Sequence, residues 1–269
     1  MTRPEMGFGP EIDLHVQIDT GRAAFGRGVL AGLVSVLQDA TCRPRTERSW
    51  GPCVLGCTMW MDDPELLAVI GQMANACVVV TKQARNKYNQ ESGKQLRALA
   101  SNNGLMQSAY WELSELVPTD QPRLVGPSWS GPDTAQIGAV REVGYRKVDN
   151  HLVPIVHAKM LLLGQMGWTD EDPVGGVADY SYFIPECVWI GSANFTKSSR
   201  KSLEMGMWTS DPSLLAAART WLLTLISISE PFGASADDPS PELLPVEYDE
   251  AAMIDAMHEL WDDSDDDGR

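Results

Sequence analysis

Residues 153–163 read Val-Pro-Ile-Val-His-Ala-Lys-Met-Leu-Leu-Leu, and this stretch decides the fold. Its apolar residues form a nearly continuous run, which is typical of a β-strand that is buried on both faces. Alternate residues of a strand point to the same side, so His157 and Lys159 can project together into one pocket. The stretch therefore predicts a central strand over 153–163 that carries a histidine and a lysine.

A second short apolar segment, residues 187–190, ends in Gly191-Ser192-Ala193-Asn194, and Glu204 follows ten residues later. If this second strand continues past the glycine, Ser192 and Asn194 also share one face. The glycine would allow a phosphate to come close to the backbone. Two predicted strands thus end or begin in polar side chains.

These residue types suit the chemistry of a phosphodiester. Lys159 supplies a fixed cation, while Ser192 and Asn194 supply neutral hydrogen-bond donors for the charge that builds on the phosphate oxygens. A histidine nucleophile must be held in one tautomer, and a carboxylate on its second ring nitrogen does this. Glu204 fits that role. The candidate catalytic residues are therefore His157, Lys159, Ser192, Asn194 and Glu204.

The ordered set over residues 153–210 resembles the catalytic motif of the phospholipase D superfamily. The resemblance implies an α/β fold, in which a mixed β-sheet is flanked by helices on both faces. It also implies a metal-independent phosphodiesterase that works through a phosphohistidine intermediate on His157. Neither a cofactor nor a metal site is implied.

The sequence departs from the family pattern in two places. The pattern has an aspartate five residues after the lysine, and this chain has Gly164. In the family this aspartate mostly supports the local structure and is not the attacking group. Its loss leaves a catalytically silent scaffold as an alternative to an enzyme. In addition, residues 165–186 look like an inserted loop. Its aromatic residues could frame a substrate, but packing of the loop onto the body is the preferred interpretation: Trp168, Tyr180, Tyr182 and Phe183.

The motif occurs once, whereas the family builds its active site from two copies. The other histidines, His15, His151 and His258, do not lie in a matching second motif. The displacement needs a nucleophile and a separate general acid on the opposite side of phosphorus. The resemblance therefore implies a homodimer in which His157 of a second copy serves as the acid.

The substrate and the compartment are inferred from the family and from composition. Short members with one motif resemble dimeric nucleases, including those of restriction and phage-defence systems. We therefore expect a nucleic acid substrate, DNA rather than RNA, with a phospholipase or phosphatidyl transferase as the alternative. No apolar run reaches about 18 residues, the start lacks the pattern of a signal peptide, and the five cysteines suit a reducing compartment. A cytoplasmic protein without membrane contact is expected.

The formal net charge of -16 is unevenly distributed. Residues 237–269 contain 13 acidic side chains and one basic side chain, so the rest of the chain is much closer to neutral. We therefore expect a catalytic domain over 1–230, followed by a proline-containing linker and acidic tail over 231–269. Blocks of like charge are usually solvated. The tail could alternatively compete with a polyanion for the active-site groove.

Three groups of basic residues could flank such a polyanion. The first follows the apolar run 77–80, the second precedes the motif strand, and the third lies between Asn194 and Glu204. Charge runs more often form a solvated face, so their position beside the motif is the argument for binding. The groups comprise Lys82, Arg85, Lys87, Lys94 and Arg97; Arg141, Arg146 and Lys147; and Lys197, Arg200 and Lys201.

Periodicity and capping residues predict the remaining elements. Helices are expected over 22–39, over 64–70 after Asp63-Pro64, over 92–101, over 213–228 after Asp211-Pro212, and over 250–261. Strands are expected over 54–60, 76–81, 139–147, 153–163, 187–190 and 203–209. The proline-rich stretch 118–134 is expected to be loop. The order strand 54–60, helix 64–70 and strand 76–81 predicts a β-α-β unit with a parallel strand pair.

Overall fold

The computed structural model describes residues 14–82, 91–101, 104–114, 116–118, 124–125, 137–144, 147–148, 151–152, 155–170, 180–233, 243–245, 247–248, 251–252 and 254–255. A mixed sheet of nine strands forms the centre of this part, in the order β1-β2-β12-β11-β10-β3-β4-β7-β13. β3, β4 and β7 run parallel to one another, and the other neighbours are antiparallel. The strands are β1 (Leu14–Ile18), β2 (Gly21–Gly26), β3 (Ser49–Thr58), β4 (Asn75–Thr81), β7 (Val140–Val143), β10 (Met160–Thr169), β11 (Tyr180–Gly191), β12 (Glu204–Thr209) and β13 (Glu230–Pro231).

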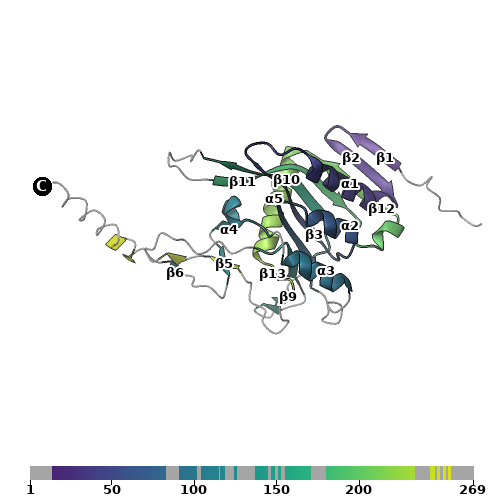
Figure 1. Ribbon diagram of the computed structural model, residues 1–269. Coiled ribbons are helices and arrows are strands. Elements are labelled where there is room, and N and C mark those ends of the chain that lie inside the picture. The colour runs from purple at the N-terminus through teal and green to yellow at the C-terminus, as the bar shows by residue number, and fades with distance from the viewer. Residues whose placement is uncertain are drawn as a thin grey trace, which may run out of the picture.

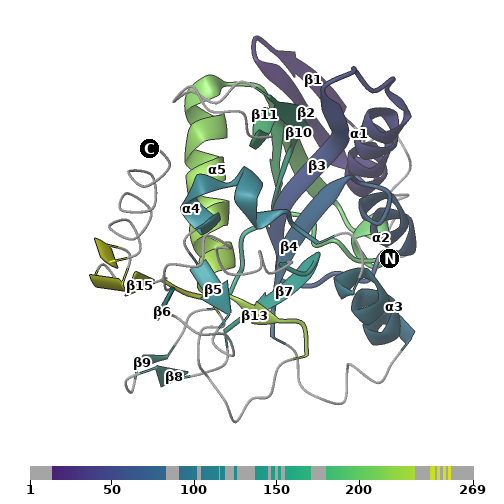
Figure 2. The same ribbon diagram turned by 60° about the vertical axis from the view of Figure 1, so that its left-hand side comes forward.

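Helices cover both faces of this sheet, as Figures 1 and 2 show. One face packs against α1 (Val29–Cys42), α2 (Pro64–Ile70) and α3 (Glu91–Ala100). The other face packs against α4 (Trp111–Ser114), the neighbouring 3-10 turn η3 (Gln107–Ala109) and α5 (Pro212–Ser227). Each interface is a separate cluster of buried apolar side chains, and this confirms the predicted α/β fold with helices on both faces.

Smaller elements lie outside the main sheet. They are the strand pairs β5 (Leu116–Pro118) with β14 (Leu243–Pro245), β6 (Leu124–Val125) with β15 (Glu247–Tyr248), and β8 (Lys147–Val148) with β9 (His151–Leu152), and the 3-10 turn η4 (Ser199–Lys201). None of the described helices is both long and apolar enough to cross a membrane.

The β-α-β prediction is confirmed. Asp63 accepts a hydrogen bond from the Leu66 amide and caps α2, with Pro64 as the first helical residue. Such a cap satisfies an amide that the helix leaves without a partner. The helix then returns the chain to β4, which pairs in parallel with β3. The carboxyl ends of β3 and β4 consequently lie at the same end of the sheet.

Three predicted elements need correction. The helix expected over 22–39 is instead β2 followed by α1, because Arg22 and its neighbours pair with β12. The strand expected over 153–163 begins only at Met160, and residues 155–159 approach it as irregular chain. The expected inserted loop is a long hairpin, since β10 extends to Thr169 and β11 starts at Tyr180.

Other predictions are confirmed or lie beyond the described residues. α3, α5 and β12 are found within one or two residues of the predicted positions, and Asp211 caps α5 through the Leu214 amide. Most of the stretch 118–134, most of the tail beyond residue 233, and the charged segment 262–267 lie outside the described residues. The division into a domain over 1–230 and a tail over 231–269 stays a prediction.

Candidate active site

The predicted site residues gather at one end of three neighbouring strands. β10 begins just after Lys159, and β11 runs antiparallel to it and ends at Gly191. The Gly191 amide donates to the Lys159 carbonyl at 3.1 Å, so the two half-motifs adjoin each other directly. β12 begins at Glu204 beside the end of β11. Residues that are 35 positions apart in the sequence, from Lys159 to Asn194, therefore belong to one end of the sheet.

His157 and Lys159 lie together, although they precede the strand. The Lys159 Nζ donates to the His157 carbonyl at 2.7 Å and lies 3.5 Å from the His157 Nε2. Lys159 is nearly buried, whereas His157 is exposed. The ammonium group is thus fixed beside an imidazole that a ligand can reach, and an anion bound there would meet both groups.

Ser192 and Glu204 form a second pair. The Ser192 hydroxyl donates to the Glu204 Oε2 at 2.6 Å, and the Met205 amide donates to the Ser192 Oγ at 3.0 Å. The carboxylate was expected to orient the ring of His157. In the described part of the chain Glu204 bonds to Ser192 and forms no hydrogen bond with His157, so it orients the hydroxyl in this structure.

Asn194 is held in place by its neighbour, Phe195. The Phe195 amide donates to the Trp60 carbonyl at 3.1 Å, and the Asp62 amide donates to the Phe195 carbonyl at 2.9 Å. These bonds tie the chain after β11 to the segment between β3 and α2. The Asn194 side-chain oxygen is buried and has no hydrogen-bond partner in the described part of the molecule. The two amide atoms can exchange places by rotation, so this position can present an NH2 donor to a ligand.

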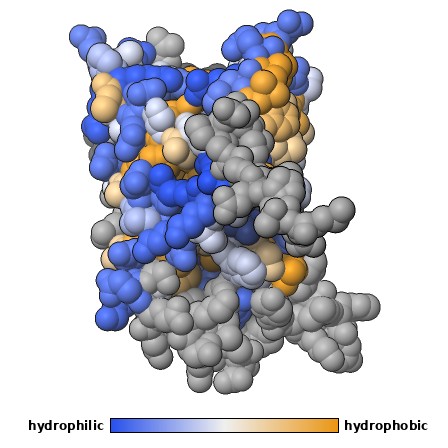
Figure 3. All heavy atoms as spheres, turned by 90° about the vertical axis from the view of Figure 1, so that its right-hand side faces the viewer, coloured by the Kyte–Doolittle hydropathy of each residue, from blue (hydrophilic) through white to orange (hydrophobic). Residues whose placement is uncertain are grey.

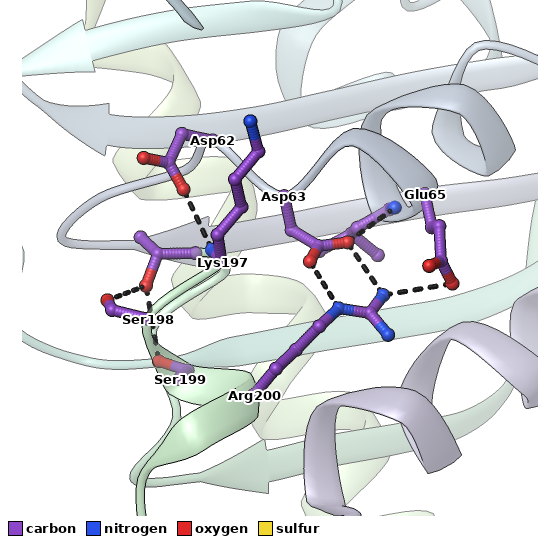
Figure 4. A network of polar contacts seen from close by, with 9 residues as sticks. Asp62, Asp63, Glu65, Lys197, Ser198, Ser199 and Arg200 are labelled. Carbon is purple, nitrogen blue, oxygen red and sulfur yellow. Dashed lines mark hydrogen bonds and ion pairs between the residues drawn. The ribbon is translucent and has the colours of Figure 1, made fainter.

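A network of polar contacts, drawn in Figure 4, extends this attachment. The Arg200 guanidinium binds both oxygens of Asp63, and it also contacts Glu65 at 3.1 Å. The Lys197 amide donates to the Asp62 carboxylate at 2.9 Å. Burial opposes ionisation of Asp63, but the hydrogen bonds and charge of Arg200, with the α2 amides, outweigh it and lower the pKa of this carboxyl. The same hydrogen bonds raise the pKa of Arg200.

The basic clusters predicted from the sequence are only partly available to a ligand. Lys82 is buried and forms an ion pair with Glu230 at 3.1 Å, and Arg141 is buried against Ser229. Arg200 is committed to Asp63. Lys197 and Lys201 remain exposed beside the site. Lys94 and Arg97 are exposed on α3, while Arg85, Lys87 and Arg146 lie outside the described residues.

Gly164 has a structural reason to lack a side chain. It lies at an irregularity in the pairing of β10 with β11. A Cβ at this position would fall 2.1 Å from the Ile184 carbonyl oxygen and 2.6 Å from the Phe183 ring. The aspartate of the family pattern therefore does not fit here.

The four aromatic residues of the expected loop differ in burial. Phe183 is buried and contacts Tyr110, as the packing interpretation predicts. Tyr180 is exposed, and Trp168 and Tyr182 are half-buried.

Cys57 lies directly beside the motif. Its thiol contacts the Ala158 carbonyl at 3.8 Å. Burial raises the pKa of Cys57 to about 12, against the opposing effects of a backbone hydrogen bond and the charge of Lys159. The group therefore remains a thiol near neutral pH and is a poor nucleophile. Within the described ranges, no group of three or more His, Cys, Asp or Glu residues could hold a metal ion.

No protein-family model and no curated protein matches the chain. Similar solved structures include NucT from Helicobacter pylori, with 11% identity and a TM-score of 0.47, over 82% of this chain and 99% of that chain. Nuc from Salmonella typhimurium, described as a phospholipase D family member, has 12% identity and a TM-score of 0.40, over 74% of this chain and 90% of that chain. Polyphosphate kinase from Porphyromonas gingivalis has 13% identity and a TM-score of 0.40, over 79% of this chain and 23% of that chain. At these values the likenesses say nothing about activity.

Proposed function

We propose that the protein is a phospholipase D-like phosphodiesterase that cleaves nucleic acid, DNA rather than RNA, without a metal ion. One observation carries the proposal, namely the meeting of His157, Lys159, Ser192, Asn194 and Glu204 at one end of β10, β11 and β12. An exposed imidazole beside a fixed ammonium group provides a nucleophile and a cation for a phosphodiester. The hydroxyl and amide donors stabilise the charge that develops on its oxygens.

The reaction has two displacements. The His157 Nε2 attacks phosphorus, a P–N bond forms, and the P–O bond to the leaving group breaks. A second acid protonates the leaving oxygen. Water then attacks the phosphohistidine while the same group, now a base, accepts a proton from that water, and the P–N bond breaks. The described part of the chain provides no second histidine beside His157, so we assign the acid to His157 of a second copy.

A surface that could receive this second copy adjoins the site. Leu14, Phe25 and Met205 are direct neighbours across β1, β2 and β12, so they share one face of the sheet, and all three are exposed. Met205 is also the residue whose backbone binds Ser192. The side of the molecule that carries these strands faces the viewer in Figure 3, where hydrophobic atoms reach the surface. A two-fold axis through this region would bring two active sites together.

The test is cleavage of plasmid DNA and of labelled oligonucleotides in the presence of EDTA. We expect activity to survive EDTA, and His157→Asn to remove it by several orders of magnitude with an unchanged melting temperature. Lys159→Ala should be nearly as harmful. Hydrolysis of phospholipid vesicles, measured in parallel, distinguishes a lipid enzyme. Loss of activity in EDTA with rescue by magnesium, or an active His157→Asn variant, would contradict the proposal.

A further inference from the structure

A cavity of about 320 Å³ lies far from the candidate active site, where β10 and β11 extend beyond the carboxyl end of α1. Three arginines and one glutamate are the charged residues in its wall: Arg43, Arg45, Arg48 and Glu186. We call it the arginine cavity. Arginines outnumber carboxylates in this wall although the chain has a net charge of -16, and such a local excess of guanidinium groups favours an anionic ligand.

The three arginines differ in how far they are neutralised. Arg43 contacts Glu186 at 2.9 Å, and Arg48 contacts Asp170 at 3.2 Å, and all four side chains are substantially exposed. Exposed pairs of this kind are weak and exchange readily with a ligand. Arg45 has no carboxylate partner within the part of the chain that the structure describes. Its guanidinium is therefore available to a phosphate.

Two glycines shape the cavity. Gly51 has a φ of +122°, and a Cβ there would lie 3.3 Å from the Arg45 Nε, so the absence of a side chain lets the guanidinium lie against β3. At Gly167 a Cβ would lie 2.8 Å from the Tyr182 ring. The Tyr182 ring therefore packs against Gly167 of β10, and Tyr182 forms part of the cavity wall. Backbone without side chains brings both an arginine and an aromatic ring to this surface.

Two aromatic side chains, Trp50 and Trp168, lie near the cavity but on the opposite face of the sheet, because alternate residues of β10 point to opposite sides. Arg48 lines the cavity and also reaches this aromatic pair. Trp50 is 47% exposed, and its ring centroid lies 6.3 Å from that of Trp168. The Arg48 guanidinium carbon lies 6.0 Å from the centre of the Trp168 ring. Exposed aromatic rings interleaved with arginines are the arrangement that binds single-stranded nucleic acid, because the rings stack on unpaired bases and the cations contact phosphates.

We propose that the arginine cavity, together with Trp50, binds a single strand of nucleic acid at a distance from the catalytic residues. This inference rests on the proposed function and assigns a second contact for the same substrate. Lys159, just before β10, and Gly167 are eight residues apart, which corresponds to about 26 Å of extended chain. Helices cover both faces of β10 between them, so a strand that binds at both places must pass around the helices, and only an oligonucleotide of more than a few nucleotides can reach both contacts. A duplex has no free bases for Trp50, so the single strand is preferred.

The test measures binding without cleavage. Full-length protein with His157→Asn is titrated against fluorescent oligothymidylates of 4 and 16 nucleotides, and binding is followed by anisotropy at several salt concentrations. Arg45→Ala, added to this background, should weaken the 16-mer about fivefold and lower its salt slope by about 0.7. The 4-mer is too short to span both contacts, so its binding at the active site should not change with Arg45→Ala. Trp50→Ala tests separately whether the 16-mer contacts Trp50.

Controls separate this cavity from a general effect of charge. Arg22→Ala removes one exposed cation from β2, outside the cavity wall and outside the three basic groups, and should leave binding of the 16-mer unchanged. Inorganic polyphosphate, which has charge but no bases, should compete less well than the oligonucleotide, and a 16-base-pair duplex should bind more weakly than the single strand. Equal losses with Arg22→Ala and Arg45→Ala, or unaltered binding by folded Arg45→Ala and Arg45→Glu variants, would overturn the inference. A protein that binds the 16-mer through Arg45 but never cleaves it would refute the proposed function alone.

Discussion

The Arg200 guanidinium donates two hydrogen bonds to the Asp63 carboxylate, and the bond from its Nη2 to Oδ1 is 2.8 Å long. The same carboxylate caps α2 through the Leu66 amide at 3.0 Å. The Asp63 side chain is fully buried. One acidic residue thus joins the start of a helix to the chain that follows Asn194, and it couples the stability of the fold to the geometry of the candidate active site.

Arg200→Ala should lower the free energy of unfolding by about 2–3 kcal/mol, because it leaves a buried carboxylate without its cation. Arg43→Ala is the matched control. It breaks an exposed pair with Glu186 and should cost less than about 1 kcal/mol. Chemical denaturation measures both. If the two variants are equally stable, the attachment at Asp63 contributes nothing beyond a surface contact.

The contribution of Asp63 should depend on pH in a defined direction. Its folded pKa is lowered, so its stabilising effect is complete above the unfolded pKa of about 3.9 and declines as the pH falls through the folded value. The difference in stability between wild type and Asp63→Asn should therefore stay constant from pH 7 to about pH 5 and shrink below about pH 4. Urea denaturation of both proteins across this range gives the answer, and a difference that grows in acid would contradict the assignment.

Gly164→Asp, which restores the family's residue, should harm the protein instead of improving it. The new Cβ would fall 2.1 Å from the Ile184 carbonyl oxygen, so β10 and β11 would have to separate locally. We expect a loss of at least about 2–3 kcal/mol in stability. Gly32→Ala is the control, since no atom lies within 4 Å of its added Cβ, and in α1 it should stabilise by about 0.5–1 kcal/mol. A Gly164→Asp protein that melts like wild type would show that this packing is not tight.

Mixing of subunits tests the shared site. After exchange of equal amounts of wild type and His157→Asn, the activity should fall to about a quarter of that of pure wild type, because each mixed dimer lacks one of two required histidines. Simple dilution would leave about half. Met205→Glu places a charge on the exposed apolar row and should weaken the dimer in sedimentation measurements. An active monomer would remove the second copy from the mechanism.

Removal of residues 237–269 should tighten the binding of polyanions. This segment carries 13 acidic side chains and one basic side chain, and its repulsion of a nucleic acid is strongest when salt does not screen it. The gain in affinity should therefore be larger at low ionic strength. Filter binding of the inactive protein, with and without the tail, measures the effect. Equal affinity at all salt concentrations would assign the tail to solubility alone.

The sequence predicts the elements whose signals are local. Asp63-Pro64 and Asp211-Pro212 mark helix starts, and β3, α2 and β4 follow from apolar runs between them. Local periodicity misleads at Arg22, because pairing with β12 is a long-range contact that makes a strand of residues with helical spacing. The hairpin of β10 and β11 resembles a loop in the sequence for the same reason, since its mixed aromatic and polar residues become strand only through pairing with each other and with β3.

The candidate site shows the same difference between residues with a local sequence signal and contacts that only the folded chain brings together. The five motif residues are visible in the sequence because their spacing is short and ordered. The attachment of Phe195 to Trp60 and of Arg200 to Asp63 spans more than 130 positions and has no local signal. The arginine cavity has no local signal either, since Arg45 and Tyr182 are 137 positions apart and line one cavity only in the folded chain. The three arginines within residues 43–48 are its one local feature.

β10 is bonded along both edges, to β3 and to β11, over most of its length. Such a strand neither stretches nor bends easily, so the separation between Lys159 and Gly167 is constant. A flexible polymer that binds at both places therefore spans a fixed distance on the protein. Fragments too short to reach from one end to the other would escape once formed, while longer ones would be retained and cut again. The molecule would then set the size of its products by mechanical span, with no need to read the identity of any base.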